Sequence, residues 1–226
     1  ARVEKSFRSN VAAAGQLAWL ETFIARQDAG RFVTWDARKA AAGPGSDIPL
    51  PVMLMSQGAP HCLRWQGQPL FKTAFDFALI PMLLAELKPA TVFEIGAGLG
   101  TSATWMAELL RAQKNPAMVH AVDIHPPQSQ DPQVVFHRGD CRTPESLFPP
   151  ETLRNAAHPW LVLEDVHINV APVLSYLDGW MAAGDYLFVE DSLNKADAIA
   201  AFLASRPLYR VDSHYTDFFG RNATCA

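Results

Sequence analysis

Short apolar runs alternate with longer amphipathic segments from residue 90 onward. Six of the runs have the length and composition of β-strands: 91–95, 118–123, 134–137, 160–164, 185–190 and 208–212. Apolar residues at helical spacing lie between several of them, at 101–113, 170–181 and 195–205. Strands separated by helix-length segments need crossover connections, which predicts an α/β fold with a Rossmann-like, doubly wound and mostly parallel sheet.

The chain before the first of these strands has a different pattern. Helical periodicity predicts helices over residues 11–28 and 73–87, and the Ala/Gly/Pro-rich stretch at 40–52 predicts an irregular loop or lid. We therefore predict two parts, an N-terminal helical and lid extension over residues 1–88 and a Rossmann-like core over residues 89–226.

Composition limits the kinds of partner that the chain can bind and the cellular setting that it fits. The 226 residues are 49% hydrophobic, enough for one sizeable core, and the net charge of −4 gives no general attraction to nucleic acid or anionic membranes. The apolar part of the first predicted helix is too short and interrupted to span a bilayer. We expect no nucleic-acid or membrane partner, and a homo-oligomer formed through that helix. Three cysteines without metal-ligand spacing (Cys62, Cys141, Cys225) favour a reducing, cytoplasmic setting.

Residues 91–102, with the sequence TVFEIGAGLGTS, are the most informative segment. A buried strand ends near Glu94, and a glycine-rich turn leads into a helix. The glycines of the turn are Gly96, Gly98 and Gly100. A dinucleotide-binding fingerprint places its third glycine at position 101, which is Thr here, and Glu94 would repel a pyrophosphate. S-adenosylmethionine carries an ammonium and a sulfonium but no phosphate, so the turn favours this cofactor. A glycine turn in an unliganded α/β protein is the alternative.

Acidic residues also follow the second and third predicted strands. Asp123 lies roughly 25 residues after the glycine turn, where an ionised carboxylate accepts both hydroxyls of a ribose. A loop cap before Pro126 is its other interpretation. Asp140, beside Cys141, is placed to accept a hydrogen bond from an adenine amino group, although Gly-Asp is also common turn chemistry.

The fourth and fifth strands end in more carboxylates, Asp165 after one and Glu190 and Asp191 after the other. Neighbouring strands bring these groups to one rim, where they repel one another unless a positive charge lies between them. Oxygen ligands favour Mg²⁺. Adjacent strand residues point to opposite faces, so Glu190 and Asp191 share a metal only if the backbone turns there, and Glu164 competes with Asp165. Strand-end acids without a metal are the alternative.

His167 is the candidate general base because it lies two residues beyond Asp165 and ionises near neutral pH. A solvated loop histidine is the simpler interpretation. His214 and His61 are reserve candidates, and His120, inside a predicted strand, is expected to be structural.

These residues resemble the class I S-adenosylmethionine methyltransferases, and within them the cephalosporin hydroxylase-like family of cephamycin C-7 and rhamnosyl O-methyltransferases. The resemblance covers roughly residues 60–223. It is carried by WQGQPLFK at 65–72 with Asp76, LKPATVFEIG at 87–96, GDYLFVEDS at 184–192 and DFFGRNAT at 217–224. The glycine turn with Ser102 is also similar to that of catechol O-methyltransferase.

The resemblance implies cofactor contacts from the glycine turn and the strand ends: Glu94, Gly96, Ser102, Asp123 and Asp140. We also expect Gly98 and Cys141, their neighbours in the sequence, to contact the cofactor. It implies Mg²⁺ at the acid of the fourth strand with Glu190 and Asp191, and a nearby histidine base, a role that His167 fits. The chain departs from the family pattern around 164–167, which leaves the choice between Glu164 and Asp165 open. Lys72 is a candidate to face the active site, but its role does not transfer securely from the family.

We therefore expect an S-adenosylmethionine-dependent, Mg²⁺-assisted O-methyltransferase that acts on a hydroxyl of a small molecule in specialised-metabolite (antibiotic) biosynthesis. Mg²⁺ would lower the pKa of the hydroxyl, His167 would take its proton, and the oxygen would attack the methyl group in line. One alternative is a protein of the same fold that binds the cofactor without transferring methyl, as a partner or for another reaction. The glycine spacing disfavours a second alternative, an NAD-dependent oxidoreductase.

Overall fold

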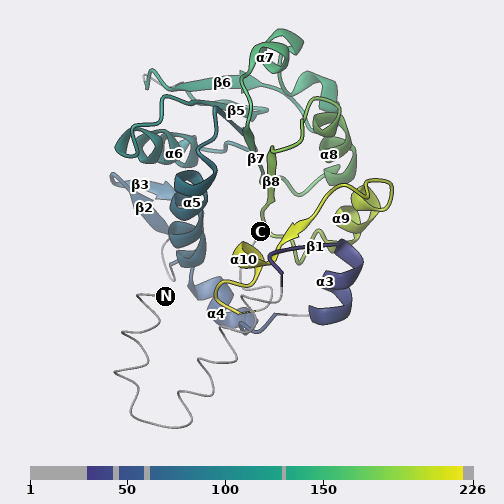
Figure 1. The fold of residues 1–226 in the computed structure, drawn as a ribbon. Coiled ribbons are helices and arrows are strands. Elements are labelled where there is room, and N and C mark those ends of the chain that lie inside the picture. The colour runs from purple at the N-terminus through teal and green to yellow at the C-terminus, as the bar shows by residue number, and fades with distance from the viewer. Residues whose placement is uncertain (1–29, 43–45, 59–61, 129–130, 221–226) are drawn as a thin grey trace.

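A five-stranded parallel sheet forms the centre of the molecule (Figure 1). This computed structural model describes residues 30–42, 46–58, 62–128 and 131–220. The strand order is β6-β5-β4-β7-β8. The strands are β4 (Thr91–Ile95), β5 (Met118–Asp123), β6 (Val134–Arg138), β7 (Trp160–Glu164) and β8 (Tyr186–Val189). The predicted Rossmann-like sheet is confirmed, and the bounds of its strands agree closely with those predicted.

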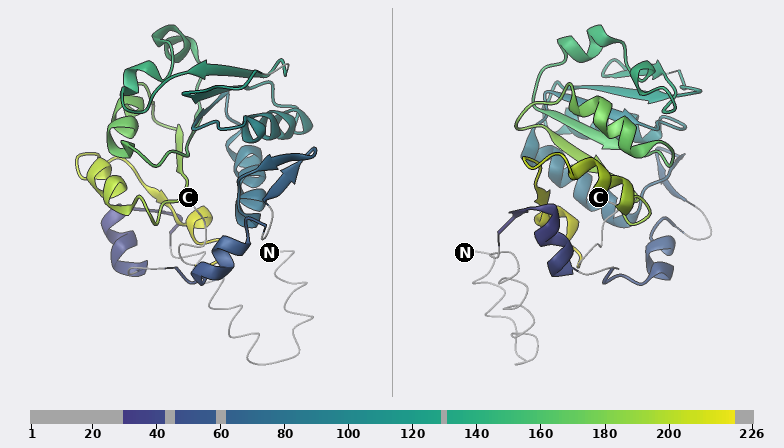
Figure 2. Two further views of the ribbon diagram at one scale, coloured as in Figure 1. Left: turned by 180° about the vertical axis from the view of Figure 1, so that it is seen from behind. Right: turned by 90° about the vertical axis from the view of Figure 1, so that its right-hand side faces the viewer.

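Helices cover both faces of the sheet (Figure 2). They are α5 (Ala74–Leu87), α6 (Thr101–Ala112), α7 (Pro150–Asn155), α8 (Val170–Asp178) and α9 (Ala196–Leu203), with the short 3₁₀ helix η1 (Pro144–Ser146). Alternation along β4 divides the core, because Val92 packs on one face with α5 and α6 while Phe93 packs on the other with α7 and α8. The apolar runs are therefore strands buried on both faces.

The chain reverses its direction across the sheet between β4 and β7. From β4 it proceeds to β5 and β6 on one side, and it then returns to β7 and β8 on the other. Every residue of β4 and β7 is buried. Ligands of doubly wound sheets bind outside the carboxyl ends of the strands at such a reversal, so Glu94 and the residues after Glu164 lie at the expected position.

The sixth predicted strand differs from expectation. Of residues 208–212 only β9 (Val211–Asp212) is a strand, and it pairs antiparallel with β1 (Phe32–Val33), outside the parallel sheet. Arg31 Nε donates to Asp212 Oδ1 at 2.9 Å and fastens the pair. Figure 1 shows the purple segment with β1 beside the yellow segment that contains β9.

The residues before β4 form short elements: α3 (Trp35–Ala42), α4 (Leu50–Met55), β2 (Leu63–Trp65) and β3 (Gln68–Leu70), while α10 (Ser213–Thr216) follows β9. The irregular stretch expected at 40–52 is thus helical at both ends. The helix predicted at 11–28 lies outside the described residues. Because α5 shares a core with the sheet, this part of the proposed extension packs directly on the central fold.

The start of α5 is fixed by a reciprocal cap. Thr73 Oγ1 accepts the Asp76 N–H at 3.1 Å, and Asp76 Oδ2 accepts the Thr73 N–H at 2.9 Å. This cap also fixes the backbone next to Lys72. Among the described residues, no helix combines the length and apolar character needed to cross a membrane.

Candidate functional site

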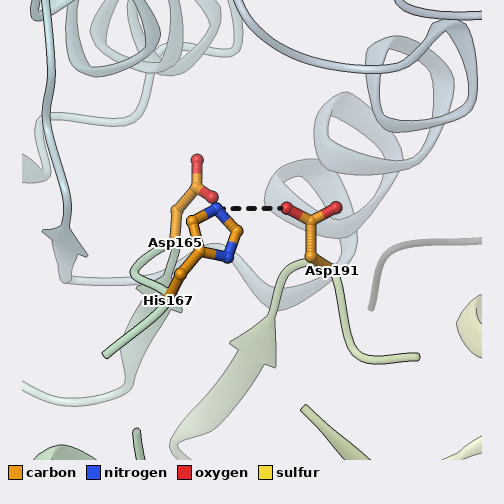
Figure 3. Close-up of side chains that lie close together, drawn as sticks. All are labelled: Asp165, His167 and Asp191. Atoms are coloured by element: carbon orange, nitrogen blue, oxygen red, sulfur yellow. Dashed lines mark ion pairs between the residues drawn. The ribbon is translucent and has the colours of Figure 1, made fainter. Parts of the chain in front are cut away.

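Three predicted site residues converge beyond the carboxyl ends of β7 and β8 (Figure 3). One ligand atom from each of Asp165, His167 and Asp191 lies within 4.8 Å of the others. His167 Nε2 is 3.6 Å from Asp191 Oδ2. Asp191 has a φ of +51°, so the backbone turns directly after Glu190, as sharing of one site by these strand ends requires. The group offers two carboxylates and an imidazole, a donor set that suits a divalent cation.

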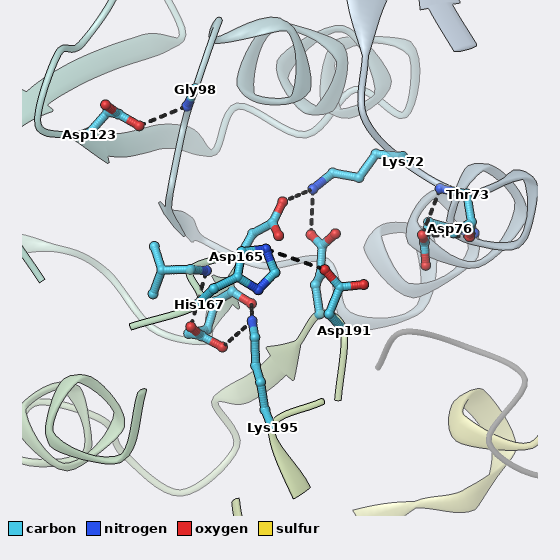
Figure 4. Close-up of polar contacts among 12 residues, drawn as sticks. Lys72, Thr73, Asp76, Gly98, Asp123, Asp165, His167, Asp191 and Lys195 are labelled. Atoms are coloured by element: carbon cyan, nitrogen blue, oxygen red, sulfur yellow. Dashed lines mark hydrogen bonds and ion pairs between the residues drawn. The ribbon is translucent and has the colours of Figure 1, made fainter. Parts of the chain in front are cut away.

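Glu190 is not part of this group, and a buried lysine, Lys72, bridges it to Asp165. Figure 4 shows Lys72 extended toward Asp165. Lys72 Nζ donates to Glu190 Oε1 at 2.6 Å and to Asp165 Oδ2 at 2.9 Å. Burial lowers the pKa of Lys72, but the two carboxylates outweigh it and hold that pKa well above its usual value. Lys72 therefore supplies positive charge among acids that the sequence analysis assigned to a metal alone. Its place in the WQGQPLFK motif was the available sequence signal.

Glu164 points away from Asp165. Its buried carboxylate accepts a hydrogen bond from Lys195 Nζ at 2.9 Å and another from the Val166 N–H at 3.1 Å. The geometry therefore places Asp165, not Glu164, in the convergent group. Lys195 had no recognisable sequence pattern and was missed.

The glycine turn is closely packed at both ends, Gly96 and Gly100, and open in the middle at Gly98. A Cβ on Gly96 would lie 2.4 Å from the backbone oxygen of Asp165, whereas a Cβ on Gly98 would meet no atom within 4 Å. Asp123 Oδ2 accepts the Gly98 N–H at 3.0 Å, and its Oδ1 accepts the His125 N–H at 2.9 Å. Asp123 therefore stabilises the turn, and its half-buried carboxylate keeps acceptor capacity for a ligand.

Glu94 is fully buried, and neither of its oxygens has a hydrogen-bond partner among the described residues. Burial raises the pKa of Glu94 to about 7, against the opposing charge of Lys72. A buried carboxylate without a partner is costly, and a cationic ligand group would supply what it lacks. Ser102 is buried in the first turn of α6, which follows the same glycine turn.

Asp140 and Cys141 differ in their surroundings. The Asp140 carboxylate accepts the Arg142 N–H at 2.9 Å and remains partly exposed, so it shows the turn chemistry that competed with adenine binding. The Cys141 side chain packs in the core with Leu147 and Phe148, and burial raises the pKa of its thiol to about 11. A contact from Cys141 to a cofactor would have to come from its backbone.

The other histidines do not join the group. His120 Nδ1 lies 3.0 Å from His137 Nε2 within the sheet. His214 packs edge-on against Tyr215, with ring centroids 5.2 Å apart. His61 lies outside the described residues.

A cavity of about 940 Å³ lies along the outer edge of β8 and extends to β9. Its walls are largely apolar, with Leu187, Phe202 and Leu203 among them, and no predicted site residue lines it. The chemistry-bearing residues instead gather at the strand ends.

Comparison with known proteins agrees with this geometry. The family model for rhamnosyl O-methyltransferase/CmcI matches residues 59–197. A rhamnosyl O-methyltransferase of Mycobacterium leprae (strain TN) is 26% identical over 165 residues, covering 69% of this chain and 72% of the relative. That of Mycobacterium tuberculosis (strain ATCC 25618 / H37Rv) is 26% identical over 164 residues, covering 68% of this chain and 66% of the relative.

Two solved structures share the fold. The CmcI-N160 apo-structure is 25% identical with a TM-score of 0.53, covering 78% of this chain and 76% of the other. The structure cmcI-D160 Mg-SAM is 22% identical with a TM-score of 0.52, covering 83% of this chain and 96% of the other, a likeness of fold. Because the family model spans more than half of the sequence, the chain belongs to the rhamnosyl O-methyltransferase/CmcI family.

Proposed function

We propose that this protein is an S-adenosylmethionine-dependent O-methyltransferase that acts on a hydroxyl group of a small molecule with the help of Mg²⁺. The observation that carries the proposal is the position of the partnerless Glu94 carboxylate beside the Asp165, His167 and Asp191 group at the reversal of the sheet. Membership in the family and relatives that are rhamnosyl O-methyltransferases support it. A neighbouring structure that contains Mg and SAM supports both cofactors.

The cofactor would lie across the glycine turn. The Glu94 carboxylate suits its ammonium group, the open backbone at Gly98 permits close approach, and Asp123 suits the ribose hydroxyls. Ser102, Asp140 and the Cys141 backbone would border the same site. S-adenosylmethionine supplies a methyl group already activated on a sulfonium, so the protein mainly has to position and activate the acceptor oxygen.

The metal site would be built on Asp165 and Asp191, which face one another. Glu190 would join them only if its ion pair with Lys72 opens. A divalent cation held there would lower the pKa of the acceptor hydroxyl.

His167 would act as the general base. Its side chain is exposed, and the Asp191 carboxylate 3.6 Å away orients the ring. A role in specialised metabolism, a cytoplasmic location and a homo-oligomer formed through residues 11–28 belong to the same proposal.

The proposal is tested by transfer of labelled methyl from S-adenosylmethionine to a panel of hydroxylated acceptors that includes rhamnosides. Asp191→Ala and Glu190→Ala should each lower turnover at least 100-fold while cofactor binding, measured by calorimetry, stays within about threefold. Glu151→Ala, an exposed acid on α7, is the control and should leave both unchanged.

Excess EDTA should stop the wild-type reaction, and added Mg²⁺ should restore it. Full activity in EDTA would exclude the metal mechanism. Tight cofactor binding without methyl transfer to any acceptor would identify a non-methylating member of the family.

A further inference from the structure

A buried ion pair joins the two loops that carry the candidate reaction residues. Lys195 lies directly before α9, and its Nζ donates to Glu164 Oε2 at 2.9 Å. The two side chains are 3% and 0% exposed. Figure 4 shows Lys195 extended from its own loop toward the end of β7. The pair therefore cross-links the loop after β8 to the last residue of β7.

Glu164 continues this link into the loop that contains Asp165 and His167. Its Oε1 accepts the N–H of Val166, the residue between them, at 3.1 Å. One carboxylate thus fixes the peptide that separates two site residues and also binds the lysine from the neighbouring loop.

Two backbone turns connect Lys195 to Asp191. The backbone oxygen of Asp191 accepts the Asn194 N–H at 2.9 Å, and that of Ser192 accepts the Lys195 N–H at 3.2 Å. These successive turns make residues 191–195 one compact unit. A displacement of the Lys195 side chain is therefore transmitted to Asp191.

We propose that Lys195 and Glu164 are positioning residues, which hold Asp191 at its short distance from Asp165 and His167. The inference rests on the proposed function only in assigning those three residues to the reaction. Glu164 acts through the Val166 amide and Lys195 through the turn at 191–195. Partners that orient the ligands of a site commonly change metal affinity or activity 10–100-fold when they are lost.

The test is Lys195→Met, which keeps the length of the side chain and removes its charge. We expect the affinity for Mn²⁺, used alone as the probe in calorimetry, to fall at least tenfold and kcat to fall by a similar factor. Affinity for S-adenosylmethionine should stay within threefold, because the side chains of this pair bond to each other and to the Val166 amide, and not to the residues of the glycine turn.

Two further variants separate positioning from general stability. Glu164→Gln combined with Lys195→Met removes the unpaired buried charge, while the Gln oxygen still accepts the Val166 N–H, so at least a third of the Mn²⁺ affinity lost in the single variant should return. Arg206→Met breaks another ion pair, 2.7 Å from Asp178, that joins the end of α8 to the residues after α9. It should lower thermal stability without changing Mn²⁺ affinity.

Wild-type Mn²⁺ affinity and kcat in Lys195→Met would overturn the positioning role, as would an equal loss in Arg206→Met. A wild-type protein that binds no divalent cation would instead contradict the proposed metal site. In that case crystal structures of Lys195→Met and of the double variant decide the positioning role. Separation of the Asp165 and Asp191 carboxylates in Lys195→Met, reduced in the double variant, supports it. An unchanged distance in Lys195→Met overturns it.

Discussion

Glu94 and His120 are held toward their neutral forms by the same physical cause. Burial raises the pKa of Glu94 to about 7 and lowers that of His120 to about 4, because an interior disfavours charge of either sign. The effects on stability oppose one another. Folded Glu94 binds its proton more tightly than the unfolded chain does, so its contribution decreases as pH rises from about 4.5 to 7. His120 binds its proton less tightly, so its contribution increases as pH rises from about 4 to 6.5.

Glu94→Gln tests the first of these groups. Because the change removes a buried carboxylate without a partner, the free energy of unfolding at pH 8 should be unchanged or higher by about 1 kcal/mol. Affinity for S-adenosylmethionine at pH 8 should fall about tenfold, equivalent to about 1.4 kcal/mol. Calorimetry from pH 6 to 8 should show wild-type affinity rising as Glu94 ionises and a flat profile for the variant. Equal affinities at pH 8 would contradict an ionic contact.

His120→Gln tests the contribution of His120 to the pH dependence of stability. The imidazole stacks on Phe93, with ring centroids 5.4 Å apart, and faces His137, whose pKa burial also lowers. In urea denaturation between pH 4 and 6.5, the free energy of unfolding of the variant should fall less steeply as the pH is lowered. The difference in slope from wild type should correspond to less than one proton, or less than about 1.4 kcal/mol per pH unit. The exposed His125→Gln is the control. An unchanged slope in His120→Gln would mean that this imidazole ionises alike in the folded and unfolded chain.

At the scale of elements, the glycine turn packs against the β7 loop at Gly96. Gly96 has a φ of +97° and approaches the backbone of Asp165, whereas Gly184, at +101°, faces open space. Both positions disfavour a side chain, but only the first adds a steric clash. Alanine substitutions at Gly184 and Gly96 therefore distinguish the free-energy cost of backbone strain from the cost of a steric clash.

Gly184→Ala should cost about 1–2 kcal/mol in the free energy of unfolding, from backbone strain alone. Gly96→Ala should cost at least about 2 kcal/mol more, because the Cβ displaces Asp165, and should weaken binding of S-adenosylmethionine. Denaturation with urea and cofactor calorimetry measure the two effects. Similar losses in both variants would show that the two loops separate without cost.

At the scale of the whole molecule, one polar network joins the two ends of the described chain to the sheet. Arg31 Nη2 donates to Asp212 Oδ2 at 2.8 Å, and the Tyr186 hydroxyl of β8 donates to the same oxygen at 3.0 Å. Arg31 also pairs with Glu86 of α5, which accepts the Tyr215 hydroxyl at 2.8 Å. The carboxylate of Asp212 is buried, so it is the centre of the network.

Asp212→Ala should lower the free energy of unfolding by about 2–3 kcal/mol, because it removes the buried carboxylate that binds Arg31 and leaves the Tyr186 hydroxyl without its acceptor. It should also speed tryptic cleavage after Arg31, since the Arg31 side chain loses its hydrogen bonds to Asp212 and the pairing of β1 with β9 is weakened. Glu86→Ala, at a more exposed site, should cost only about 1 kcal/mol. Equal losses in the two variants would show that the exposed Glu86 contributes as much to stability as the buried Asp212, and would contradict the central role of Asp212.

Local chemistry in the sequence determined the five strands of the parallel sheet, the helices α5, α6, α8 and α9 that cover it, and the glycine turn. Apolar periodicity and turn residues act over a few positions, so the bounds of β4 and α6 could be predicted closely. The alignment of parallel strand ends also brought Asp165 near Asp191. The composition of 208–212 predicted a strand but not its partner, since the hydrogen bonds of a strand depend on residues far away in sequence.

Only the tertiary structure decided which basic side chain forms an ion pair with which acid. Lys72 reaches Asp165 across 93 residues, Lys195 reaches Glu164 across 31, and Arg31 reaches Asp212 across 181. Strand alternation established that Glu164 and Asp165 point to opposite faces, but not which face holds a buried cation. The crossover connections determine where each lysine or arginine side chain lies. A buried cation there must pair with a nearby carboxylate, because an unpaired buried charge is costly.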